Sequence, residues 1–161
     1  MEDSLKITLN ADWDEIELVR ERSSKFLKYH GFSDDDVHSL VMVISELIEN
    51  SIKYGKFKKS QNKVCVTLNI SKNLITIEVN NPVDEKTAYD LRRLDRTIQW
   101  IRGYQDSFEA YIERMKEISK KPLQDEESGL GLVRIAYEGK AILDFFVRED
   151  NILNVSAVTK I

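Results

Sequence analysis

The sequence predicts an α+β fold in a single domain, because two kinds of periodicity divide the chain. Five short segments alternate apolar and polar residues, as half-buried strands do, while longer segments repeat apolar residues every three or four positions, as amphipathic helices do. Four of the strand segments form two pairs joined by short polar turns, which predicts a mostly antiparallel sheet. The 161 residues are close to the roughly 150 of an average domain, so we assign residues 1–161 to one domain.

The chain begins with a strand at Leu5–Leu9, where apolar residues occupy alternate positions. A helix follows, capped by Asp12 or Asp14 and continuing to about Tyr29, and Gly31 ends it. The apolar face of this helix consists of Ile16, Val19, Phe26 and Leu27.

A second helix is predicted between Ser33 and Gly55. Ser33 and the three aspartates after it resemble a capping box, and these aspartates lie at the positive end of the helix dipole. Gly55 is suited to end the helix. The apolar positions, spaced as on a helix that packs on a core, are Val37, Leu40, Val41, Ile44, Leu47, Ile48 and Ile52.

Two predicted hairpins supply the other strands. Ser71-Lys72-Asn73 joins the first pair, Glu149-Asp150-Asn151 joins the second, and a short helix at 130–137 precedes the second pair. The four strands are expected at 64–70, 75–79, 141–147 and 152–158.

Pro82 and Pro122, the two prolines of the chain, bracket a predicted helical insertion at 85–121. It is either one helix of roughly 40 Å or two antiparallel helices broken at Gly103. Its apolar stripe packs on the same domain or, alternatively, forms a surface for a homodimer or another partner. The stripe consists of Leu91, Leu94, Ile98, Ile101, Tyr104 or Gln105, Phe108, Tyr111 or Ile112, Met115 and Ile118.

Composition excludes several classes of protein. A net charge of −4 without a densely basic run argues against nucleic-acid binding by charge neutralisation. The chain contains no stretch of about 20 apolar residues, so no membrane span is predicted. No signal peptide is expected either, and we therefore predict a cytoplasmic protein. The single cysteine, Cys65, excludes an internal disulfide. We expect His30 and His38 at the surface, and Trp13 and Trp100 as packing residues, with Trp100 alternatively an interface anchor.

The second helix carries a candidate site. Glu46 and Asn50 are four residues apart and share a helix face, and Lys53 lies near the same face. Carboxylate and amide oxygens suit Mg²⁺ or its bound water, an ammonium suits phosphate, and the carboxylate suits proton abstraction. The alternative is an ordinary solvated helix face.

A second candidate is the glycine-containing segment 126–132. Two glycines at the start of a helix let backbone N–H groups approach an anion, which the positive helix end also favours. The alternative is a plain loop before a helix.

The order of these features resembles the GHKL ATPase superfamily, which includes gyrase, the Hsp90 chaperone, histidine kinases and MutL. The helix with Glu46, Asn50 and Lys53 is followed by two strands, an intervening segment, Ser-Gly-Leu-Gly-Leu opening a helix, and two more strands. The resemblance implies a two-layer Bergerat sandwich, in which helices cover one face of a mixed, mostly antiparallel sheet. It covers the chain except 85–121, which replaces the usual ATP lid.

The small size and the leading strand and helix look most like anti-sigma-factor serine/threonine kinases. The resemblance implies ATP and Mg²⁺ as cofactors, and a STAS-domain antagonist or a sigma factor as partner. It implies that Glu46 is catalytic and polarises the nucleophile, and that Asn50 binds Mg²⁺. The other implied nucleotide contacts are Lys53, Tyr54, Asn80, Asn81, Gly129, Leu130 and Gly131.

The chain departs from this family at the first glycine box, where an Asp-x-Gly-x-Gly motif is expected. Asn80-Asn81-Pro82-Val83 stands there, without either glycine. Asparagine still offers an acceptor, but Pro82 fixes φ and has no N–H. The SiaB-type protein kinases, a divergent branch of the superfamily, similarly combine an asparagine here with a helical stretch and a Gly-Leu-Gly-Leu box.

Two hypotheses follow. The first is a Mg·ATP-dependent serine/threonine kinase that regulates a partner protein. The second is a binding module that works without nucleotide, by dimerisation or by sequestering a partner through the helix at 91–118.

Overall fold

The computed structural model describes residues 3–58, 62–84, 88–103, 112–114, 116–117 and 130–161. The elements in chain order are β1 (Ser4–Asn10), the 3₁₀ turn η1 (Trp13–Glu15), α1 (Ile16–Tyr29), α2 (Asp34–Tyr54), β2 (Lys63–Ser71), β3 (Leu74–Pro82), α3 (Ala88–Arg102), α5 (Leu130–Glu138), β4 (Ala141–Val147) and β5 (Ile152–Lys160).

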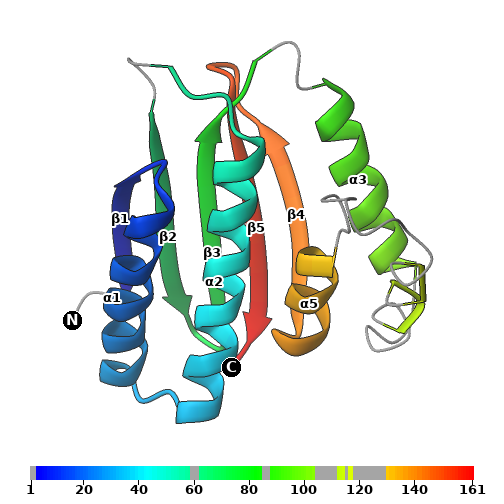
Figure 1. Ribbon diagram of the computed structural model, residues 1–161. Helices are drawn as coiled ribbons and strands as arrows, with labels where there is room; N and C mark the ends of the chain where they lie inside the picture. Colours follow the sequence, from blue (N-terminus) through cyan, green and yellow to red (C-terminus); the bar gives the residue numbers. More distant parts are fainter. Residues whose placement is uncertain (1–2, 59–61, 85–87, 104–111, 115, 118–129) are drawn as a thin grey trace.

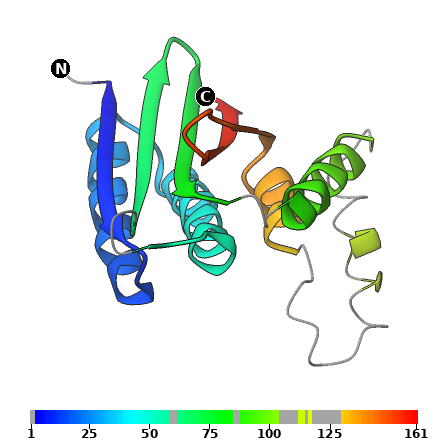
Figure 2. The same ribbon diagram turned by 90° about the horizontal axis from the view of Figure 1, so that it is seen from above.

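The five strands form one sheet in the order β1-β2-β3-β5-β4. Each described pairing is antiparallel, so the sheet is not mixed. Helices α1, α2 and α5 cover one face of it, and α3 lies beyond α5 on the β4 side (Figure 1 and Figure 2). The predicted α+β class, with helices on one face of the sheet, is confirmed.

The core lies between the sheet and the helix layer. Val64, Val66 and Leu68 of β2 are fully buried at alternate positions, as the pleat requires. They belong to the same cluster as Ile44 and Ile48 of α2, which are also fully buried. Each such side chain contributes about 1.5–3 kcal/mol by leaving water. This packing fixes α2 on the sheet, so the polar residues of its free face have fixed positions too.

Local sequence signals fix the helix ends. Ser33 Oγ accepts a hydrogen bond from the Asp36 N–H at 3.1 Å, which caps α2. Gly31 has φ +83°, a left-handed conformation that favours glycine after a helix. Asp12 accepts from the Asp14 N–H at 3.0 Å, but it caps η1, and α1 begins only at Ile16.

Helix α3 ends at Arg102, so the described part of the insertion is not one long helix. The Gly103 N–H donates to the carbonyls of Gln99 and Trp100 at 3.0 and 3.2 Å. Ile98 and Ile101 of the predicted stripe are 1% and 8% exposed, so they pack within this chain. Stripe positions 104, 105, 108, 111, 115 and 118 lie outside the described residues.

Arg102 fastens α3 to the edge of the sheet. Its guanidinium donates to the carbonyl of Leu143 in β4 and lies 3.9 Å from the carboxylate of Asp144. This contact satisfies a carbonyl of an edge strand, which has a neighbour on one side only. It holds the C-terminal end of α3 against β4.

The surface position predicted for His30 is wrong. Its side chain is 8% exposed, and its Nδ1 lies 2.8 Å from the carbonyl oxygen of Phe26. The same Phe26 carbonyl accepts the backbone N–H of His30 at 3.2 Å, so the imidazole lies folded back against the last turn of α1. No described helix is long and apolar enough to cross a membrane.

Candidate functional site

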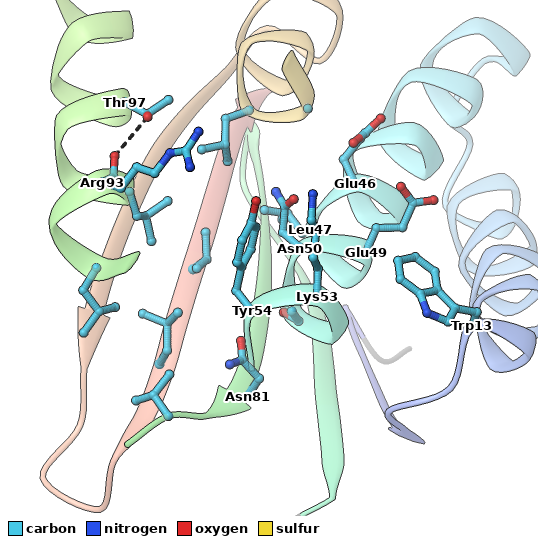
Figure 3. A pocket seen from close by; sticks show the side chains of 18 residues that line it. Trp13, Glu46, Leu47, Glu49, Asn50, Lys53, Tyr54, Asn81, Arg93 and Thr97 are labelled. Atoms are coloured by element: carbon cyan, nitrogen blue, oxygen red, sulfur yellow. Dashed lines mark hydrogen bonds between the residues drawn. The ribbon is translucent and has the colours of Figure 1, made fainter. Parts of the chain in front are cut away.

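A cavity of about 350 Å³ lies between α2, α3 and α5, with β3 and β5 at its floor (Figure 3). Apolar side chains form much of its wall, and polar groups enter mainly from α2, an arrangement typical of small-molecule sites. The lining residues are Trp13, Glu46, Leu47, Glu49, Asn50, Ser51, Lys53, Tyr54, Asn81, Val83, Leu91, Arg93, Leu94, Thr97, Gly131, Leu132, Leu153 and Val155.

One face of α2 supplies most of the polar lining. Glu46, Asn50 and Tyr54 succeed one another at four-residue steps, which places them on one side of the helix. Lys53 lies beside them, with its ammonium 5.3 Å from the centre of the Tyr54 ring. The structure therefore gathers around one cavity the four α2 residues that the sequence predicted as site residues.

The first turn of α5 meets α2 at Gly131. A Cβ atom at this position would lie 2.5 Å from Glu46 Oε2 and 3.9 Å from Asn50 Nδ2. Such a distance to a carboxylate oxygen is far inside van der Waals contact, so a side chain here would displace Glu46. Glycine thus allows the start of α5 to approach the polar face of α2.

Glu46 is the electrostatic centre of the site. Its side chain is 18% exposed, and its Oε1 accepts a hydrogen bond from Arg134 Nη1 at 3.0 Å. Burial raises the pKa of this carboxyl above its ordinary value, and the neighbouring charges of Glu49 and Glu138 act in the same direction. The Arg134 guanidinium opposes them and lowers the pKa.

The two asparagines predicted as nucleotide contacts point to opposite faces of the sheet. Asn81 is 2% exposed and lines the cavity floor, where its Nδ2 donates to the Pro82 carbonyl at 3.0 Å. Asn80 accepts a hydrogen bond from Asn154 Nδ2 at 2.8 Å, on the face that the helices leave open. Successive strand residues alternate between faces, so the structure does not bring Asn80 to the cavity.

The remaining predicted contacts belong to the start of α5. Leu130 is the first residue of α5, and Gly131 lines the cavity. Gly129 lies outside the described residues.

Several cavity residues were missed by sequence reasoning. Arg93 and Thr97 come from α3, and Figure 3 shows the guanidinium of Arg93 reaching from α3 toward the cavity interior. Trp13 was predicted to be a packing residue, but it is 56% exposed and lines the edge of the cavity. Arg134 carried no sequence signal, because its partner Glu46 is 88 positions away in the chain.

The donor set suits a cation that keeps part of its own coordination shell. The described part of the chain holds no group of three or more histidine, cysteine, aspartate or glutamate side chains placed to bind a metal. Mg²⁺ commonly binds through one or two protein oxygens together with water and phosphate oxygens. Asn50 and Glu46 can supply such oxygens, so the site fits Mg²⁺ held jointly with a phosphate ligand.

No family model and no curated protein matches the sequence. Among solved structures, a chain of the SiaB–SiaC complex from Pseudomonas aeruginosa matches with a TM-score of 0.73 and 18% identity, over 96% of this chain and 88% of the other. The RsbU and RsbW domains of Rv1364c from Mycobacterium tuberculosis match with a TM-score of 0.57 and 12% identity, over 98% of this chain and 32% of the other. These matches confirm the α+β fold predicted from the sequence, with helices on one face of an antiparallel sheet, and at such identities they establish the fold alone.

Proposed function

We propose that this protein is a regulatory protein kinase that binds Mg²⁺·ATP in the cavity and phosphorylates a serine or threonine of a protein partner. The observation that carries the proposal is the meeting of Glu46, Asn50 and Gly131 at one end of a mostly apolar cavity. A carboxylate, an amide and the N-terminal turn of a helix are three groups suited to a metal-bound phosphate.

The apolar wall of the cavity, with Asn81 beside it, suits a nucleobase. Leu132, Leu153 and Val155 offer apolar walls, and Asn81 offers an amide at the floor. An amide presents both a donor and an acceptor, so it can pair with the polar edge of a base. The volume of about 350 Å³ lies at the lower end of the range for small-molecule sites, roughly 300–1,000 Å³.

The polar residues of the cavity would have different roles in phosphoryl transfer. Bound Mg²⁺·ATP would supply an electrophilic terminal phosphoryl group. Asn50 would hold the metal, while Lys53 and Arg93 would lie against phosphate charge and stabilise the charge that spreads in the transition state. Glu46 would accept the proton of the attacking hydroxyl, a role that needs the carboxylate in its ionised form.

A protein as phosphoryl acceptor is supported by the proteins that share this fold. One matching chain was solved in the SiaB–SiaC complex, and the other contains RsbU and RsbW domains. The acceptor we propose is a STAS-domain antagonist, with a sigma factor as the alternative partner. A new phosphate would add about −1.5 to −2 charges to the partner and so change its interface.

The segment around Pro82 favours a second candidate, a binding module without nucleotide. This segment contains no glycine, and the Asn81 amide already donates to the Pro82 carbonyl. A homodimer through 91–118 stays a prediction, although Ile98 and Ile101 are buried within the chain itself.

Calorimetry with Mg²⁺·ATP and Mg²⁺·ADP separates the two candidates. We expect wild type to bind, and Asn50→Ala to bind about tenfold more weakly or worse, equivalent to about 1.4 kcal/mol or more. The matched control is Asn69→Ala, since Asn69 is an exposed asparagine of β2 outside the cavity. Absence of binding to wild type at millimolar nucleotide would favour the binding module, and equal binding by Asn50→Ala would contradict the assigned site.

A further inference from the structure

In the described part of the sheet, β4 is an edge strand, with β5 on one side and no strand on the other (Figure 1). Arg148, directly after β4, donates its backbone N–H to the carbonyl of Ile152 in β5 at 2.8 Å. Every second residue of an antiparallel strand bonds to the same neighbour, so Leu143, Phe145 and Val147 turn their backbone groups away from β5. The free edge of β4 is therefore a row of donors and acceptors to which another strand can pair.

Two of these outward backbone groups are already bonded to side chains. The Arg102 guanidinium of α3 donates to the Leu143 carbonyl, and Asp144 Oδ1 accepts the N–H of Phe145 at 2.8 Å. The guanidinium and the Asp144 carboxylate lie 3.9 Å apart, so both charged groups lie together on this edge. We call Arg102 and Asp144 the β4 edge pair. Charged side chains on an edge strand oppose its pairing with another chain.

The side chains of β4 that face away from the helices are mostly apolar. Ile142 is 65% exposed and Phe146 is 53% exposed, whereas Leu143 of the opposite face is buried. Asp144 lies between the two exposed apolar residues on the same face, as strand alternation requires. An exposed edge strand with large apolar side chains is a site at which chains associate.

The occupant that fits this edge is β4 of a second copy, in an antiparallel register centred on Asp144. Ile142 of each chain would lie opposite Phe146 of the other, and aromatic–β-branched pairs of this kind stabilise sheets. The same register would bond the Leu143 carbonyl of one chain to the Phe145 N–H of the other. The β4 edge pair occupies these two groups, and the two Asp144 carboxylates would face each other, which destabilises such a register.

We propose that the free edge of β4 is a pairing surface for a second copy of this chain, and that Arg102 and Asp144 keep the two copies from pairing there. Only one side chain of α3 bonds to the Leu143 carbonyl in this way, so a displacement of Arg102 makes that acceptor available. The surface is separate from the cavity, because none of these residues lines it. The proposal therefore holds whether or not the protein binds nucleotide.

The first test is sedimentation equilibrium of the double variant Arg102→Ala/Asp144→Thr without nucleotide. Threonine suits a strand and removes the facing charges. We expect dimerisation about tenfold tighter than in wild type or more, because each hydrogen bond and each apolar pair forms twice by symmetry.

The matched control is Arg148→Ala/Asp150→Thr, which removes an ion pair of the same kind from the β4–β5 turn. This control should associate as wild type does. Thermal unfolding checks that each variant keeps its fold. A folded Arg102→Ala/Asp144→Thr variant that associates no more tightly than wild type would overturn the proposal, and so would an equal gain in the control.

The second test is a disulfide that forms only in the proposed register. Ile142→Cys and Phe146→Cys are combined with Cys65→Ser, which removes the single native thiol. The two positions would lie opposite each other at a Cα distance of about 4.5 Å, within the roughly 4.4–6.8 Å that a disulfide spans. Along one strand they are about 13 Å apart, at roughly 3.3 Å per residue, so the bond can form only between chains.

Under mild oxidation, we expect the covalent dimer to form about tenfold faster or more once Arg102→Ala and Asp144→Thr are added, because the paired state is more populated. Equal rates with and without these two changes would contradict the role of the β4 edge pair. The absence of a covalent dimer in both proteins would contradict the register itself.

Discussion

Gly131 is the position where a single methyl group would disturb the site most directly. Its Cβ would lie 2.5 Å from Glu46 Oε2, and the tip of a glutamate can move aside without unfolding the protein. Glycine-to-alanine changes inside a helix ordinarily add up to about 1 kcal/mol of stability, which offsets part of this local cost. Gly131→Ala should therefore keep the fold and lose the geometry of the site.

We expect Gly131→Ala to unfold within a few degrees of wild type, since about 1 kcal/mol shifts the unfolding temperature by only some 2–8 °C. Its affinity for Mg²⁺·ADP should fall about tenfold or more. Calorimetry and thermal unfolding measure both quantities. Gly103→Ala is the control for adding a methyl group outside the cavity lining, since its Cβ would lie 3.3 Å from the Trp100 carbonyl oxygen, a tight contact but a much milder one than 2.5 Å. Undiminished affinity in Gly131→Ala would show that the approach of α5 to Glu46 does not matter for binding.

Site residues could be predicted from the sequence where the geometry is local. Glu46 and Asn50 share a helix face whatever the helix packs against. Strand alternation also places Asn81 on the face of Ile77 and Val79 and Asn80 on the other, a distinction available in the sequence but not drawn from it. Arg134 could not be predicted from the sequence, because its contact with Glu46 depends on how α5 packs on α2.

At the scale of elements, α3 shows how an apolar stripe is ambiguous in sequence. The repeat that continues to 118 suits a dimer seam as well as an internal helix. The structure resolves this for Ile98 and Ile101, which are buried with α5 and β4 in the core of the same chain. A stripe shows that a face will be covered, but it does not show what covers it.

Replacement of Ile98 tests which of these roles the stripe plays. Ile98 is 1% exposed, so Ile98→Ala should reduce the free energy of unfolding by about 2–5 kcal/mol, through lost burial and the cavity left behind. Urea unfolding measures this change. Gln99→Ala, at the exposed neighbouring position, should change stability by less than about 0.5 kcal/mol.

Protein concentration distinguishes the internal role from the dimer. The loss in Ile98→Ala should be the same at low and high protein concentration if Ile98 packs within one chain. A loss that grows on dilution would indicate that a second copy contributes to the packing, since subunit association depends on concentration.

At the scale of the whole molecule, the sheet order was the part of the fold least accessible to sequence reasoning. Hairpin partners follow from short turns, so the β2–β3 and β4–β5 pairings were predictable. The pairing of β3 with β5 joins residues 74–82 to 152–160 across the insertion and α5. No local pattern specifies it, and the resemblance to a known family supplied the layered arrangement instead. That same pairing builds the cavity floor, so the shape of the site depends on it.

Keeping Glu46 ionised in the fold should lower the free energy of unfolding of the whole protein. Because the folded state raises the pKa of this carboxyl above its ordinary value of 4.5, the folded protein binds the proton more tightly than the unfolded chain. The protonated form of Glu46 therefore stabilises the folded protein fully below pH 4.5. This contribution is lost as the pH rises through the raised pKa of the folded state. A glutamine side chain cannot ionise, so the Glu46→Gln variant does not lose stability in this way.

Glu46→Gln should accordingly gain stability relative to wild type as the pH rises toward neutrality, and the difference should level off under acidic conditions, where Glu46 is protonated. Urea unfolding across this pH range measures the effect, with Glu21→Gln as the control for removing an exposed carboxylate of α1. The variant should also lose phosphoryl transfer, because an amide cannot accept the proton. A gain in stability together with a loss of activity is expected of a buried charge that is kept for function. A stability difference that does not vary with pH would show that Glu46 ionises as easily in the fold as in water.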